Sequence, residues 1–335
     1  MCSRRAMRIF AIAAPITTWS RPRLSSSPTS RTKCPQSSAS EAPSVACTRP
    51  SACASRPRNR RTKMELKGKT ALVTGASRGI GPHLAAALAG RGMNLVLAGR
   101  SARELEAVAA EQRKLGVRVL AVVTDLLDAD ARTLLVGACE REFGGVDVLV
   151  NNAGGDPLRE FDEMSIEENL AILDLNLTAP IALTHLVLPG MLERGRGHIV
   201  NISAMAGRVS FPFTEAYAAA KDGVIGFTRV LRSDYRGRGV TASVLILGAI
   251  KGAGQGQRTL DDMSKPSSSF MAPVEMVAKA LLRALDRDSA EIVVMPGPAR
   301  LMRALMDYFP GMGPWMNRQI GVTKTLREVQ AFRKS

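Results

Sequence analysis

Cysteine and histidine are scarce in this sequence. Beyond the first 63 residues the chain has one cysteine, Cys139, which excludes a disulfide framework there and fits a reducing, cytoplasmic environment. The whole chain has three histidines, His83, His185 and His198, scattered without the spacing typical of metal ligands. The sequence therefore predicts neither a metal site nor a disulfide-stabilised fold.

Long apolar runs and internal repeats are also missing. No stretch reaches the roughly eighteen uninterrupted apolar residues of a membrane span, and no repeat of solenoid length is present. We therefore predict no transmembrane segment. The part of the chain from Met64 to Ser335 is long enough for a single domain.

Acidic residues are nearly absent from residues 1–63, which hold eleven Arg, two Lys and only Glu41, a net charge of +12 out of +16. The remainder is mildly basic, so the pI of about 10.3 does not indicate a nucleic-acid partner. This Ser-, Pro- and Arg-rich segment is predicted to be disordered. Met64 opens MELKGKTALVTG, a natural domain beginning, which favours an over-extended translation start; an organelle transit peptide or a signal peptide are the alternatives.

From Lys67 onward, short apolar runs alternate with Ala- and Leu-rich helical patterns. Continuous apolar strands indicate burial on both faces, so this rhythm predicts an α/β fold with one parallel sheet covered by helices on each side. The strand-like runs are TALVTG, MNLVLAG, VRVLAVVTD, VDVLVNNAG, GHIVNIS, TASVLIL and EIVV.

Three glycines follow the first of these runs. Gly75 permits a tight turn, Gly79 lets backbone approach a pyrophosphate, and Gly81 lets the helix beginning near Pro82 pack against the strand. The helix N-terminus would supply N–H donors for the phosphates. A plain strand-to-helix turn is the alternative interpretation.

Four motifs in order extend this pattern: TGASRGIG at 74–81, Asn-Asn-Ala-Gly at 151–154, Asn176, and Tyr217 with Lys221. Together they resemble the classical short-chain dehydrogenase/reductase family, over roughly residues 66–294. The resemblance implies a Rossmann-type doubly wound sheet of about seven strands, a nicotinamide cofactor and hydride transfer between a carbonyl and an alcohol carbon. It also implies a homodimer or homotetramer built on long helices.

The resemblance assigns Tyr217 as the general acid of reduction. Tyr217 and Lys221 are four residues apart in a helix-favouring run and share a face, so the ammonium of Lys221 would lower the phenol pKa. Lys221 would also hold the nicotinamide ribose. Asn176 resembles the family residue that keeps a water beside the lysine; without the family it would be a mid-helix polar residue.

One hydroxyl is out of place. Relatives carry a serine thirteen residues before the tyrosine, where this chain has Ala204, while Ser203 lies at fourteen. We take Ser203 as the candidate fourth catalytic residue. Because neighbouring strand residues point to opposite faces, it can serve only if the backbone twists at the strand end.

The end of the second strand reads LVLAGRS, which bears on cofactor choice. Gly99 stands where NAD-preferring relatives have an acid, while Arg100 and Arg78 could accommodate a 2′-phosphate. We therefore expect NADP(H) to be preferred over NAD(H). Ordinary surface arginines are the alternative.

Asp125 resembles the family residue that holds the adenine amino group, with Leu126 beside the ring; a helix cap before Leu127 is the alternative role of Asp125. Taken together, the predicted cofactor-binding residues are Gly75, Ser77, Arg78, Gly79, Ile80, Gly81, Arg100, Asp125, Leu126, Asn152, Ala153, Gly154, Tyr217 and Lys221.

Substrate identity has weaker signals. A Gly-, Ser- and Gln-rich lid is expected at 251–272, with Met205, Phe211 and Phe213 as pocket walls, which suggests a small lipophilic substrate. The C-terminal extension, about 296–335, could extend the pocket, pack on a partner subunit or make peripheral membrane contact. Its apolar residues are Leu301, Met302, Leu305, Met306, Phe309, Met312 and Trp315.

A second departure from the family pattern bears on the function. The loop after the sixth strand usually reads Pro-Gly with a threonine that grips the nicotinamide, but residues 247–252 read LGAIKG. The leading hypothesis is an NADP(H)-dependent oxidoreductase acting on a lipophilic carbonyl or alcohol. The alternatives are a nucleotide-binding relative with little turnover, which Ala204 favours, and a reductase of an activated C=C or C=N bond.

Overall fold

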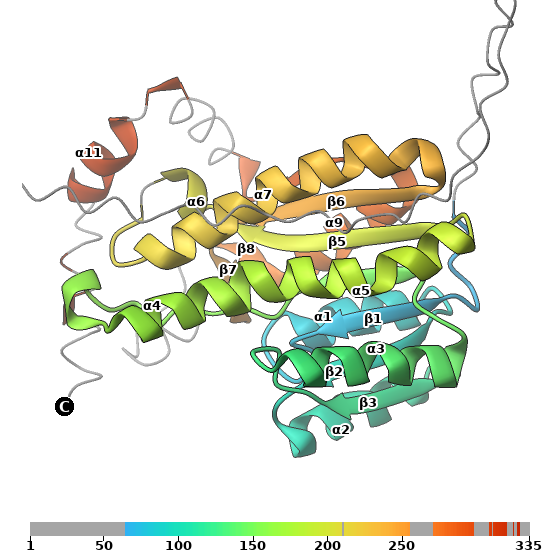
Figure 1. The fold of residues 1–335 in the computed structure, drawn as a ribbon. Helices are drawn as coiled ribbons and strands as arrows, with labels where there is room; N and C mark the ends of the chain where they lie inside the picture. Colours follow the sequence, from blue (N-terminus) through green and yellow to red (C-terminus); the bar gives the residue numbers. More distant parts are fainter. Residues whose placement is uncertain are drawn as a thin grey trace, which may run out of the picture. The chain divides into compact units, whose positions relative to one another are not determined.

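The computed structural model describes residues 64–209, 211–254 and 271–297, and near the C-terminus 308–309, 311–319, 324 and 327–328. The described residues belong to the unit formed by residues 60–335. The predictions for residues 1–63 lie outside the described residues. In this unit, helices cover both faces of a parallel sheet (Figure 1).

The sheet has seven strands in the order β3-β2-β1-β4-β5-β6-β9, all parallel. Every strand-like run of the sequence forms one of them, so the predicted α/β class and the Rossmann-type arrangement are confirmed. The strands are β1 (Thr70–Thr74), β2 (Asn94–Gly99), β3 (Val119–Val123), β4 (Val148–Asn151), β5 (Gly197–Ala204), β6 (Val240–Leu247) and β9 (Glu291–Val294).

Alternation along each strand divides the core in two. In β1, Ala71 and Val73 face one helical layer while Leu72 faces the other, and all three are fully buried. The first layer contains α1 (Gly81–Ala89), α2 (Ala102–Arg113) and α9 (Val274–Arg287). The second contains α3 (Ala129–Phe143), α5 (Ala179–Glu193) and α7 (Glu215–Tyr235).

The longest helix combines α4 (Ile166–Leu173), a π-helical stretch at Asp174–Thr178, and α5. Ser165 begins it with a reciprocal cap, accepting from the Glu168 N–H while the Glu168 carboxylate accepts from the Ser165 N–H. Among the described residues, this is the one helix whose length and composition would suffice to cross a membrane. Packing of α5 against the sheet gives its apolar residues a role within the fold.

Several short elements complete the described part of this unit. Two-residue strands β7 (Ile250–Lys251) and β8 (Ala272–Pro273) pair with each other and so join the two ends of the predicted lid. Residues 255–270 of that lid, and the extension residues 301–307, lie outside the described residues. The remaining elements are η1 (Phe161–Glu163), α6 (Ala206–Val209), η3 (Arg236–Arg238) and α11 (Met312–Gln319).

The described part of the C-terminal extension approaches the end of β5. A Cβ built on Gly313 in α11 would lie 3.0 Å from the carbonyl oxygen of Val209 in α6. This contact favours packing within the subunit for this part of the extension. The exposed side chains nearby are those of Tyr308, Phe309 and Trp315.

Candidate active site

The glycine loop after β1 is tightly built. Gly75 and Gly79 have φ of +63° and +65°, values that side-chain-bearing residues rarely adopt. A Cβ on Gly81 would lie 2.2 Å from the Gly75 carbonyl oxygen, so α1 can pack this close to the loop only with glycine there. Of the loop side chains, Ile80 is partly buried and Arg78 is exposed.

Hydrogen bonds join this loop to the residues after β4. The Thr74 hydroxyl accepts the N–H groups of Asn152 (3.0 Å) and Ala153 (3.1 Å). In return, the Asn152 side-chain amide donates to the carbonyl oxygens of Thr74 (3.0 Å) and Gly75 (3.1 Å). The carboxyl ends of β1 and β4 are therefore fixed to each other, and the predicted cofactor residues of both loops lie together.

Tyr217, Lys221 and Asn176 converge beside Gly154. The Lys221 Nζ lies 5.4 Å from the Tyr217 ring centroid and donates to the Ile202 carbonyl oxygen at 3.1 Å. A Cβ on Gly154 would lie 2.5 Å from Asn176 Oδ1 and 3.1 Å from Lys221 Nζ, so glycine is needed for this approach. Asn176 is fully buried in the π-helical stretch. The structure thus gathers three of the four predicted catalytic residues.

Asn176 also holds the backbone of the next loop. Its side-chain amide donates to the carbonyl oxygens of Gly155 (2.9 Å) and Ile172 (2.8 Å), while its Oδ1 accepts the Gly155 N–H (3.1 Å). The π-helical stretch offsets the side chain within an otherwise continuous helix, and such single-turn bulges are frequent at functional sites.

Ionisation in the site departs from the sequence-based expectation. Burial lowers the pKa of Lys221 to about 8, so its amine remains mostly protonated at pH 7. Burial, and then the charge of Asp156, raise the pKa of Tyr217 above its ordinary value. The predicted lowering of the Tyr217 pKa by Lys221 is therefore not found among the protein's own side chains, because desolvation outweighs it.

The prediction for Ser203 is not supported. Its side chain is 1% exposed, and its hydroxyl donates to the Lys221 carbonyl oxygen at 2.8 Å. Ala204, the last residue of β5, is partly exposed and pairs in register with Leu247 of β6. The strand keeps its regular alternation here, so Ser203 points to α7 and its hydroxyl serves the fold.

At the end of β2, Gly99 occupies the position where NAD-preferring relatives are expected to have an acidic residue. A Cβ on Gly99 would lie 3.2 Å from the Ser77 hydroxyl oxygen, so the glycine accommodates the glycine-loop serine. Arg100 and Arg78 are both exposed. Asp125 accepts the Leu127 N–H at 3.0 Å within a turn, whereas the residue that caps α3 is Asp128, so Asp125 is not the helix cap given as its alternative. Leu126 is buried in the second core layer.

One of the predicted pocket residues differs from expectation. Met205 is 7% exposed and packs with Ile225, Val244 and Ile246, so it belongs to the core. The loop after β6 lies over the glycine loop, because a Cβ on Gly79 would lie 3.6 Å from the Gly254 nitrogen. Phe211 and Phe213 are both partly buried just before α7.

Comparison with known proteins decides the family. The profile for short chain dehydrogenase matches residues 69–263. The chain belongs to the short-chain dehydrogenase/reductase family. It is accordingly an oxidoreductase of a family that acts on CH–OH and C=O groups, and the family's fold binds a nicotinamide cofactor.

Relatives of this family match most of the domain. The ketoacyl reductase HetN of Nostoc sp. is 34% identical over 263 residues, covering 77% of this chain and 91% of the relative. The D-beta-hydroxybutyrate dehydrogenase of Cupriavidus necator is 34% identical over 233 residues, covering 64% and 90%. A metagenomic short-chain oxidoreductase solved in complex with NADP superimposes with a TM-score of 0.60 at 30% identity, covering 70% of this chain and 99% of that one.

Sequence reasoning missed one residue of this short-chain dehydrogenase site. Asp156 is partly buried and lies two residues after the Asn-Asn-Ala-Gly motif. Burial, and then the charge of Glu215, raise its pKa to about 6. An acid so close to the motif was the available signal, but its effect on Tyr217 depends on packing that the sequence does not show.

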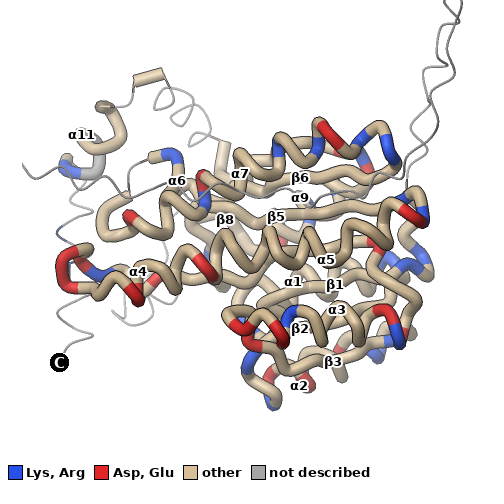
Figure 2. Tube along the Cα trace, viewed as in Figure 1, with Lys and Arg blue, Asp and Glu red and all other residues tan. Residues whose placement is uncertain are grey.

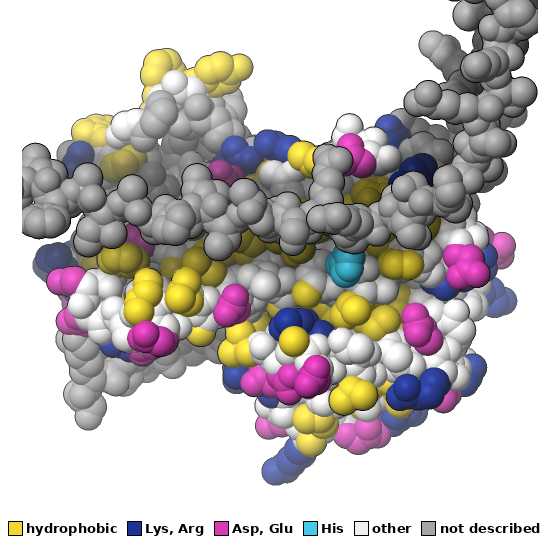
Figure 3. Space-filling view, in the orientation of Figure 1, with side chains coloured by type: hydrophobic (Ala, Val, Ile, Leu, Met, Phe, Trp, Pro, Cys, Tyr) yellow, Lys and Arg dark blue, Asp and Glu magenta, His cyan; other side chains and the backbone are white. Residues whose placement is uncertain are grey.

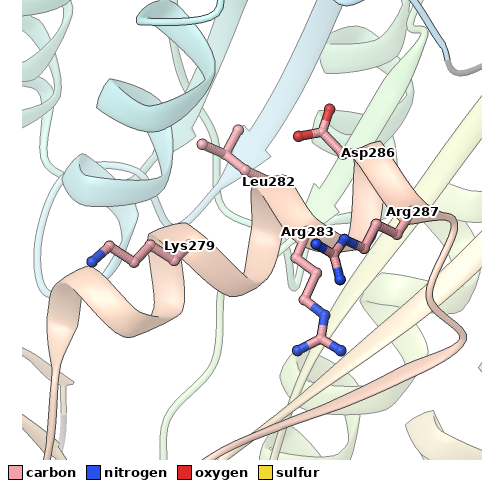
Figure 4. Close-up of a pocket in the computed structure, with 5 residues that line it drawn as sticks. All are labelled: Lys279, Leu282, Arg283, Asp286 and Arg287. Carbon is pink, nitrogen blue, oxygen red and sulfur yellow. The ribbon is translucent and has the colours of Figure 1, made fainter.

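Other surface features lie apart from this site. A depression on α9 is lined by Lys279, Leu282, Arg283, Asp286 and Arg287 (Figure 4), none of which was predicted as a site residue. Asp286 there pairs with both terminal nitrogens of Arg91 at 3.0 Å. Within the described ranges, no group of three His, Cys, Asp or Glu side chains could hold a metal ion.

Proposed function

We propose that this protein is an NADP(H)-dependent oxidoreductase that interconverts a lipophilic carbonyl compound and its alcohol. The observation that best supports this proposal is that Tyr217, Lys221 and Asn176 lie together beside Gly154, near the glycine loop. A phenol, an amine and an amide held together beside a nucleotide-binding loop match the needs of hydride transfer coupled to proton transfer.

The residues present fit a dinucleotide. The left-handed turn at Gly79 allows backbone to approach a pyrophosphate closely, and the N-terminus of α1 offers N–H groups and a positive dipole. Arg78 and Arg100, with no acid at position 99, favour a 2′-phosphate. When bound, the nicotinamide would supply or accept the hydride.

The protein's own groups would handle the proton. Tyr217 would protonate the carbonyl oxygen in reduction, and a phenol carries that proton at neutral pH. Lys221 would bind the ribose hydroxyls. Asn176 would order the neighbouring backbone and a water for proton relay.

A nucleotide-binding relative with little turnover is the competing function, and Ala204 favours it because no hydroxyl stands at the place where relatives polarise the carbonyl. NADPH fluorescence on mixing, followed by a panel of ketones and aldehydes, separates the two. We expect binding and oxidation of NADPH by at least one lipophilic ketone. Binding with no oxidation across the panel would support the competitor.

The role of Tyr217 has its own test. Tyr217→Phe should abolish reduction while NADPH still binds, because only the proton donor is removed. Tyr235→Phe, on the same helix but away from the site, is the matched control and should retain activity. Retained reduction in Tyr217→Phe would contradict the assignment.

A further inference from the structure

One side of α11 packs against the part of the fold that carries Tyr217. Gly313 is buried, and a Cβ built on it would lie 3.0 Å from the Val209 carbonyl oxygen, so glycine lets α11 pack closely on α6. α6 is joined in turn to α7, the helix of Tyr217, because Arg208 Nε lies 2.9 Å from the Asp222 carboxylate. Since α6 directly follows the carboxyl end of β5, α11 is seated at the edge of the sheet where the candidate active site lies.

Aromatic side chains on α11 and just before it are exposed. Tyr308, Phe309 and Trp315 are 83%, 61% and 55% exposed. Of the two tryptophans and three tyrosines in the chain, one of each lies in the short stretch 308–315. Figure 3 shows hydrophobic side chains on the surface around α11. Exposed aromatic surface concentrated in this way is typical of a binding surface, because its hydration costs free energy that a partner recovers.

The charge of this stretch has one sign. Residues 308–327 contain no Asp or Glu but three cations, Arg318, Lys324 and Arg327, and all three are exposed. Figure 2 shows a basic residue and no acidic residue on α11. Arg327 Nε lies 3.4 Å from the Glu160 carboxylate. Arg318 is three residues from Trp315 in α11, so these two side chains share one face of the helix.

We propose that the surface formed by Tyr308, Phe309, Trp315 and Arg318 docks on an anionic lipid membrane. In the docked state the rings lie at the boundary between headgroups and acyl chains, where tryptophan and tyrosine keep an apolar ring in lipid and a polar tip in water. Arg318 pairs with a lipid phosphate. Docking goes beyond the proposed function, whereas supply of a lipophilic substrate from the bilayer to the nearby site rests on that function.

A membrane suits this surface better than a second copy of the chain does. A two-fold contact would bring the same surface of both subunits together, and residues 308–327 offer no acid to balance Arg318. An anionic bilayer offers an apolar layer and phosphates together, so it accommodates the rings and the cation at once.

The direct test uses a probe within the surface itself. The chain has two tryptophans, so Trp19→Phe leaves Trp315 as the single one. With vesicles of phosphatidylcholine and phosphatidylglycerol, we expect Trp315 emission to move to shorter wavelength and brominated acyl chains to quench it, because the indole leaves water. Inorganic phosphate without vesicles should change neither property. The basic residues 1–63 also attract anionic vesicles, but the emission reports on Trp315 alone.

Two results of this measurement would overturn the proposal. One is an emission that neither shifts nor is quenched with vesicles. The other is a shift that appears without vesicles and grows with protein concentration, which would assign the surface to a second copy of the chain.

Substitutions locate the contact. Phe309→Ser should weaken partitioning into the mixed vesicles by about tenfold, because a buried phenylalanine ring is lost, with Tyr308→Ser as the second variant if the first fails to fold. Phe161→Ser, at a similarly exposed ring of η1, is the matched control. Arg318→Gln should weaken binding to the anionic vesicles alone, and Arg103→Gln should not. Equal effects of Phe309→Ser and Phe161→Ser would overturn the proposal.

The docking and the proposed function can fail separately. The vesicle measurements need no substrate, so their failure leaves the proposed oxidoreductase standing, and a protein that reduces no carbonyl leaves the docking standing. For substrate supply, Phe309→Ser should slow NADPH oxidation by a ketone dissolved in the vesicles and leave the rate with a short, water-soluble ketone unchanged. Equal slowing with both ketones would rule out supply from the bilayer.

Discussion

Single side chains decide how well this site can work. At the end of β5, the buried Ser203 hydroxyl is bound to the Lys221 carbonyl oxygen, and the next residue is an alanine. A pre-oriented donor aimed at a developing oxyanion is typically worth about 10²- to 10³-fold in rate. A site without it should reduce ketones slowly.

We therefore expect Ala204→Ser to raise turnover on a reducible ketone by at least about tenfold. Ser203→Ala should change the rate less and instead lower the free energy of unfolding by about 1 kcal/mol, because it removes a buried hydrogen bond. Steady-state kinetics and urea unfolding measure the two effects. If neither substitution changes the rate, the substrate is better sought among activated C=C or C=N bonds.

Arg78 and Arg100 carry the prediction of cofactor choice. Replacing both with Gln should weaken NADPH binding, because a 2′-phosphate loses its cationic partners, and leave NADH nearly unaffected. Titration of cofactor fluorescence measures both affinities. Replacing the exposed Arg103 of α2 is the control, and equal losses for the two cofactors would rule out phosphate selection.

Among the elements, α4 presents an exposed apolar side. Ile166 and Leu170 are 61% and 49% exposed and lie one turn apart, and Figure 3 shows hydrophobic side chains gathered on this part of the surface. Members of this family typically oligomerise, and we propose that this side of α4 contacts a second copy of the chain.

Leu170→Glu should then convert the oligomer to a smaller species, because a carboxylate cannot be buried there without a partner. Leu134→Glu, at an exposed leucine on α3, is the matched control and should not change the mass. Size-exclusion chromatography with light scattering gives the answer. An unchanged mass for Leu170→Glu would remove α4 from the interface.

The sequence predicted elements better than side-chain directions. Continuous apolar runs identified all seven strands, and the Tyr217–Lys221 spacing placed both residues on one face of α7. The face of β5 on which the Ser203 side chain lies depends on whether the strand twists at its last residue. That is a local property of the backbone, and no pattern in the sequence indicates it. The raised pKa of Tyr217 arises from burial by several elements together, and no single motif encodes it.

At the scale of the whole molecule, the buried His198 links stability to pH. Its Nε2 lies 2.8 Å from the Ser243 hydroxyl, whose own proton goes to the Ser289 carbonyl oxygen, so Nε2 is the donor. Burial lowers the pKa of His198 from 6.5 to about 4. The unfolded chain therefore binds the extra proton first as the pH falls below about 6.5, and folding stability drops from there toward pH 4.

Replacing His198 tests whether this residue causes the loss of folding stability at low pH. His198→Gln keeps an N–H donor but cannot be protonated, so between pH 6.5 and 5 it should lose about 2 kcal/mol less unfolding free energy than the parent. Asp156 acts in the opposite sense in the same window but is common to both. Urea unfolding at the two pH values is the measurement, and equal losses would mean that His198 is not the linked group.

The Thr74–Asn152 hydrogen bond also has a kinetic consequence. It joins residues 78 positions apart, with α1, β2, α2, β3, α3 and β4 between them. Contacts of such long sequence separation form slowly during folding, because the intervening chain must be ordered or closed first. The nucleotide site does not exist until they form. During refolding, recovery of NADPH affinity should therefore lag behind recovery of helical circular dichroism, so that affinity for the cofactor marks the chains that have completed assembly.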